Sequence, residues 1–73
     1  MYKSREKHEE TIKEMIDAMS SARILAGAEF ESLCNEGKHI HAEIFCMARE
    51  VLRVQITIIN DYLILLQKEN NDV

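Results

Sequence analysis

Residues 51–66 read VLRVQITIINDYLILL, and this stretch decides the fold. Its polar residues recur at helical spacing, and a helical wheel at about 100° per residue gathers its apolar side chains on one broad arc. That arc spans roughly 200°, whereas a surface helix needs little more than about 100° to face its core. We therefore predict a helix whose apolar surface is too wide for one neighbouring helix to cover.

Two long helices with a short turn account for nearly the whole chain. The first is expected from about Ser4, a candidate N-cap, to about residue 35, and the second from about residue 39 to about residue 69. Gly37 suits the position just after a helix end, so residues 36–38 form the expected turn. Helices of equal length joined this way predict an antiparallel hairpin that makes residues 1–73 a single domain, with residues 70–73 expected to fray.

The two helices differ in the width of their apolar surfaces. The stripe of the first helix covers roughly 120°. It comprises Ile12, Met15, Ile16, Met19, Ala22, Ala26, Phe30, Leu33 and Cys34. The second helix carries two adjacent rows, which are Ile44, Ala48, Val51, Gln55, Ile58, Tyr62 and Leu65, and Phe45, Leu52, Ile56, Ile59, Leu63 and Leu66. We expect the second row, which is purely apolar, to face the first helix.

The remaining apolar residues of the second helix are predicted to bind another polypeptide. The predicted partner-binding residues are Met47, Val51, Val54, Ile58, Tyr62 and Leu65. A chain of this length buries only about 60% of its unfolded surface, so a core built from it alone is marginal. The expected all-α hairpin is therefore completed either by a partner chain or by dimerisation into a four-helix bundle.

Two polar residues interrupt these apolar rows. Arg23 lies inside the stripe of the first helix, and Gln55 lies in the first row of the second. Each is expected either to keep its polar head in water above a buried stem or to select one pairing register with a partner.

Composition argues against several functional classes. The net charge is −4 and the basic residues are interleaved with glutamate, which argues against nucleic-acid binding. Residues 51–66 are fewer than the roughly 20 residues of a membrane span and include Arg53, Asn60 and Asp61, so no membrane insertion is expected. The N-terminal segment has no signal-peptide core, which predicts a cytoplasmic protein.

No catalytic or metal-binding pattern emerges from the sequence. Cys34, His39, His41 and Cys46 form C-x4-H-x-H-x4-C around the turn, whereas structural zinc sites pair their ligands as C-x2-4-C and H-x3-5-H. We interpret them as turn histidines and free thiols, and we expect no metal and no cofactor. Because no nucleophile, base or carboxylate pair has a supporting turn or strand, we expect no enzymatic activity.

Part of the chain resembles a known family. The match runs from about Ala28 to Leu66 and includes the turn at residues 36–38, AREVL at residues 48–52 and IINDY at residues 58–62. These features resemble the small co-chaperones of type III secretion needle subunits. The charged N-terminal segment and the two cysteines depart from the family pattern.

The resemblance implies a function for the hairpin. It would pair with a helical-repeat chaperone in the bacterial cytoplasm, and the pair would hold the needle subunit unpolymerised. The alternative is a homodimeric four-helix bundle with a structural or regulatory role, which would cover the same apolar surface by self-association.

Overall fold

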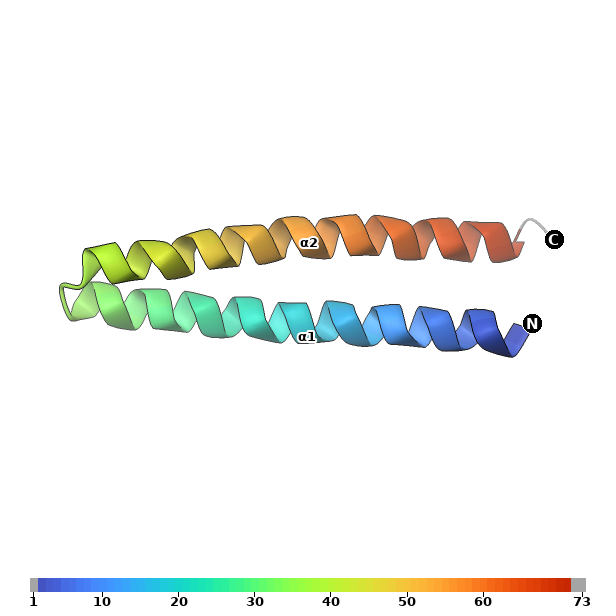
Figure 1. Cartoon of the computed structure of the whole chain (residues 1–73), viewed down its shortest axis with the longest axis horizontal. Helices are drawn as coiled ribbons and strands as arrows, with labels where there is room; N and C mark the ends of the chain where they lie inside the picture. The colour runs from blue at the N-terminus through green and yellow to red at the C-terminus, as the bar shows by residue number, and fades with distance from the viewer. Residues whose placement is uncertain (1, 72–73) are drawn as a thin grey trace.

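The computed structural model describes the backbone of residues 2–71 and the side chains of residues 6–69. Within these residues it contains two helices, α1 (Tyr2–Asn35) and α2 (His39–Asn71), and no strand. The helices lie side by side and antiparallel, so the start of α1 and the end of α2 are together (Figure 1). The predicted all-α helical hairpin is confirmed.

Both helices extend beyond their expected outer ends. The prediction that Ser4 caps α1 is wrong, because α1 already begins at Tyr2. No proline or glycine breaks the chain there, and serine inside a helix costs only about 0.5 kcal/mol relative to alanine. At the other end α2 continues through Asn70 and Asn71, which were expected to fray, while Asp72 and Val73 lie outside the described residues.

The turn is a Schellman motif centred on Gly37. The Lys38 amide donates to the Leu33 carbonyl at 2.9 Å, and the Gly37 amide donates to the Cys34 carbonyl at 3.1 Å. These bonds satisfy the carbonyls left unpaired at the end of α1, and they require a left-handed residue at position 37. Gly37 supplies it with a φ of 77°. The Lys38 carbonyl then accepts from the Ala42 amide at 2.9 Å, which starts α2 at once.

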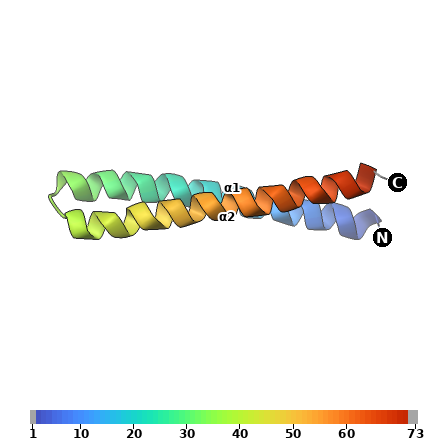
Figure 2. The ribbon, with the colours of Figure 1, turned by 90° about the horizontal axis from the view of Figure 1, so that it is seen from above.

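The row of α2 that was predicted to face α1 does so. Leu63 is buried, and Phe45, Leu52, Ile56, Ile59 and Leu66 are half-buried. Ala48 is also half-buried, so it belongs to this inner side rather than to the other row. Figure 2 shows α2 crossing α1 at a shallow angle, the arrangement that heptad-like spacing favours.

The core between the helices is thin. Among the described side chains the buried apolar residues are Ile12, Ala26, Ala42 and Leu63, two of which are alanines, and no large side chain is fully buried. The molecule measures 56 × 16 × 11 Å, so most of its surface has no second layer to cover it. A hairpin of this kind is stabilised chiefly by one seam, and additional packing would stabilise it further.

Candidate functional site

One side of α2 carries a continuous row of exposed large apolar side chains. We name it the exposed apolar face, and it consists of Ile44, Met47, Val51, Val54, Ile58, Tyr62 and Leu65. The exposed fraction ranges from 41% for Tyr62 to 61% for Met47. The residues recur every three or four positions, so they share one side of the helix. All six predicted partner-binding residues are among them.

The exposed apolar face continues onto α1 through Met15. A groove of about 220 Å³ is lined by Met15, Met19, Gln55, Ile58 and Ile59. Met15 is 45% exposed, although the sequence placed it in the inner stripe. A helical wheel with fixed angular steps does not show which edge of an apolar stripe is covered when two helices wind about each other. The two methionines one turn apart, Met15 and Met19, were the available signal for an exposed edge.

Gln55 lies in the middle of this surface. It lines the groove beside Met15, and it also lines a second groove of about 260 Å³ with Glu50, Val51 and Val54. Its side chain is exposed, so within the hairpin it does not act as a buried polar residue. Gln55 therefore offers a polar side chain in the middle of the apolar surface that a docking helix would contact.

His8 and Tyr62 join the two helices near their free ends. The Tyr62 hydroxyl lies 3.1 Å from His8 Nε2, and the rings meet edge to face with centroids 6.0 Å apart. Tyr62 thus keeps its ring in the exposed apolar face while its hydroxyl is held by α1. The sequence did not indicate this contact, because His8 and Tyr62 are far apart along the chain.

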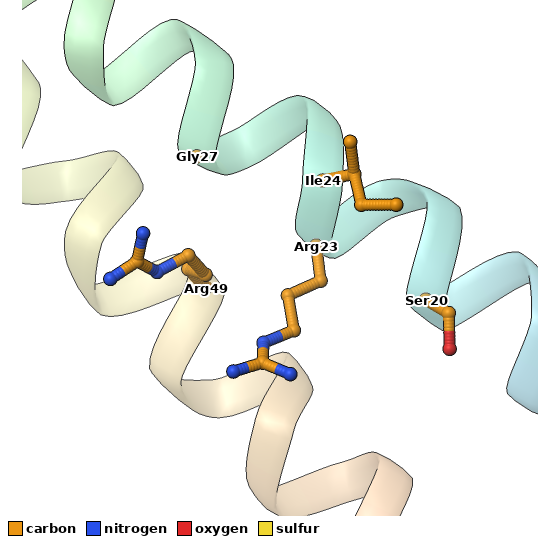
Figure 3. A pocket seen from close by; sticks show the side chains of 5 residues that line it. All are labelled: Ser20, Arg23, Ile24, Gly27 and Arg49. Atoms are coloured by element: carbon orange, nitrogen blue, oxygen red, sulfur yellow. The ribbon is translucent and has the colours of Figure 1, made fainter.

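A different surface is lined by Arg23 of α1 and Arg49 of α2. A groove of about 370 Å³, here called the arginine groove, is lined by Ser20, Arg23, Ile24, Gly27 and Arg49. Figure 3 shows Arg23 reaching from α1 towards α2 and Arg49 lying beside Gly27. A Cβ at Gly27 would lie 3.5 Å from an Arg49 guanidinium nitrogen, so the side chain of Arg49 runs close against α1. Arg23 is exposed, in keeping with an extended stem and a solvated head.

The charges of both arginines act on the carboxylate of Glu50. A hydrogen bond from Arg53, together with its charge, lowers the pKa of Glu50 below the usual value, and Arg23 and Arg49 add smaller effects in the same direction. Arg53 donates to Glu50 Oε1 through Nε at 2.8 Å and pairs with the same oxygen through Nη2 at 2.7 Å. Glu50 is therefore bound by Arg53, while Arg23 and Arg49 act on it only through weaker effects of their charge.

The cysteines and histidines near the turn do not form a cluster. Cys34 is half-buried, Cys46, His39 and His41 are exposed, and both cysteines are free thiols. Among the described residues, no three His, Cys, Asp or Glu side chains are placed to hold a metal ion. The described helices also include none that is long and apolar enough to cross a membrane. The structure thus offers apolar contact area and a cationic groove.

Comparison with known proteins finds no matching family model, no matching curated protein and no matching solved structure.

Proposed function

We propose that this chain is a non-enzymatic protein-binding module that docks its exposed apolar face onto a helical partner. One observation carries the proposal: seven large apolar side chains, each at least 41% exposed, follow one side of α2, while the described core buries only four residues. Each square ångström of apolar surface removed from water contributes about 25 cal/mol. Covering this face would therefore stabilise the hairpin and the complex together.

The spacing of the face suits a helical partner. Residues three and four positions apart on α2 form the kind of row that inserts between the side chains of another helix. Met15 widens the row onto α1 and makes a shallow two-helix surface rather than a single ridge. A concave array of helices offers the matching shape, and helical-repeat proteins supply such arrays.

The resemblance to type III secretion co-chaperones supports the same class of partner. We infer that the hairpin pairs with a helical-repeat chaperone in the bacterial cytoplasm and thereby helps to hold a needle subunit unpolymerised. The contribution of the hairpin would be structural. The hairpin would bury apolar surface of the larger chaperone, and the chaperone would bury the exposed apolar face of the hairpin.

Stoichiometry tests this proposal. Sedimentation velocity of the purified chain over a wide concentration range should show weak, concentration-dependent self-association. Mixing with the helical-repeat chaperone encoded in the same genome should give a one-to-one complex. A tight dimer that resists dilution and does not exchange into that complex would contradict the proposal and favour the four-helix bundle.

A matched pair of variants connects this result to the surface. Ile58→Asp places a charge in the exposed apolar face, whereas Asn60→Asp places the same charge on an exposed position outside it. Ile58→Asp should abolish the complex, because an unpaired charge buried in an interface costs several kcal/mol. Asn60→Asp should leave it intact.

A further inference from the structure

The arginine groove holds two guanidinium groups, those of Arg23 and Arg49. Among the described side chains the ion pairs are Lys38 with Glu36 and Arg53 with Glu50. Neither Arg23 nor Arg49 forms such a pair or a hydrogen bond with a described residue, and the nearby Glu50 is already bound by Arg53. Guanidinium groups bind carboxylates through paired, charge-assisted hydrogen bonds, so these two have free capacity for anionic groups.

The groove is also separate from the exposed apolar face. Arg49 and Ile58 are nine residues apart on α2, which is about two and a half turns and puts them on opposite sides of the helix. The residues that line the arginine groove include none of those that line the groove between Met15 and Ile58. A ligand of the arginine groove therefore needs no part of the exposed apolar face.

We propose that the arginine groove binds an acidic helical segment of the partner protein through two carboxylates, one on Arg23 and one on Arg49. This inference rests on the proposed function, since it assigns a second contact to the same partner. The guanidinium groups point to different places along the groove (Figure 3), which suits two carboxylates on one segment better than one shared ion. Ile24, which is 73% exposed at the edge of the groove, supplies an apolar contact that a free hydrated anion would not use.

The full chain can be tested with defined probes. Nitrogen-15-labelled protein is titrated with sodium acetate, with inorganic phosphate, and with a designed amphipathic helical peptide that carries two glutamates one turn apart beside leucines. A second peptide has glutamine at both positions. The signals observed are the side-chain Nε–H groups of Arg23 and Arg49 and the Gly27 amide, which lie in the groove.

The glutamate peptide should shift these signals and bind about three to ten times more tightly than the glutamine peptide at low salt, as expected for two exposed ion pairs. High salt should remove the difference. Arg23→Gln with Arg49→Gln should abolish the preference, whereas Lys68→Gln, which removes a positive charge from an exposed position outside the groove and leaves the Arg53–Glu50 pair intact, should preserve it. Circular dichroism would show that each variant is still helical.

Three results would overturn the proposal: equal binding of the two peptides, no shift of the groove signals, or tighter binding of phosphate than of the glutamate peptide at these signals. The Ile58→Asp variant separates this inference from the proposed function. It should lose the chaperone complex yet keep the preference for the glutamate peptide. A chaperone complex unaffected by Ile58→Asp would count against the proposed function alone.

Discussion

Tyr62 on α2 is held by His8 on α1, with 3.1 Å between the hydroxyl oxygen and Nε2. The bond joins residues that are 54 positions apart, one near the start of α1 and the other in the last third of α2. The imidazole tautomer decides which group donates. Because Tyr62 also belongs to the exposed apolar face, the contact fixes one end of that face relative to α1.

The His8–Tyr62 contact should contribute modestly to stability. A double-mutant cycle with His8→Ala and Tyr62→Phe should give a coupling energy of about 0.5 kcal/mol, since the bond is exposed and competes with water. Urea unfolding at fixed protein concentration measures it. Tyr62→Phe alone keeps the ring and should leave partner binding unchanged. Strictly additive effects of the two substitutions would show that the contact contributes nothing.

The two glycines should respond oppositely to substitution by alanine. Gly37→Ala forces a side chain into a left-handed backbone and should destabilise the hairpin by about 1–2 kcal/mol. Gly27 lies within α1 with ordinary φ, and a Cβ there would be in normal contact with Arg49, so Gly27→Ala should stabilise by about 0.4–1 kcal/mol. Thermal unfolding of both variants at equal concentration checks the sign. Gly37→Asn, which tolerates the left-handed conformation, should lose less than Gly37→Ala.

Substitutions at Leu63 and at Ile58 should have different effects on the stability of the isolated hairpin, because Leu63 packs in the core and Ile58 lies in the proposed binding surface. Leu63 is 8% exposed in the seam, and Leu63→Ala should destabilise the isolated hairpin by about 2–3 kcal/mol through lost burial and a residual cavity. Ile58 is 59% exposed, and Ile58→Ala should change the stability of the monomer by no more than about 0.5 kcal/mol. Chemical denaturation at the lowest workable concentration makes the comparison. A large loss for Ile58→Ala under these conditions would mean that the free chain already buries that side chain.

The pKa of Glu50 should depend on Arg53. The Arg53 hydrogen bond and charge lower the folded-state pKa of this carboxyl, so the pair contributes stability above the unfolded-state pKa and loses it as the pH falls through the lowered one. Carbon-13 NMR titration of Glu50 should show its midpoint rising in Arg53→Gln. An unchanged midpoint in that variant would contradict the assignment of Arg53 as the main cause.

The hairpin and the orientation of α2 could be predicted because they depend on patterns within one helix. Gly37 identified the turn, and the purely apolar row through Phe45, Leu52 and Ile59 identified the inner side of α2. Both patterns can be interpreted without knowing how the other helix packs. A glycine directly after a helix usually ends that helix, and a row of apolar residues along a helix usually faces the core.

The remaining features depend on how the helices meet. Ala42 is 1% exposed beside the turn, yet a small residue gives no periodic signal of its burial. Met15 turns outward because α1 and α2 wind about each other, and the arginine groove forms only where residues of α1 approach Arg49. Such features follow from the relative placement of two segments, which single-helix periodicity does not encode.

Site-specific photo-cross-linking in the native cells shows which polypeptide covers the exposed apolar face. A photoreactive phenylalanine analogue is placed at Val54 or Ile58 in the exposed apolar face, and at Asn60 as the control on another side of α2. We expect cross-links from Val54 and Ile58, but not from Asn60, to a helical-repeat chaperone. Cross-links to a second copy of this chain, or equal labelling from all three positions, would contradict the proposal that such a chaperone covers this face.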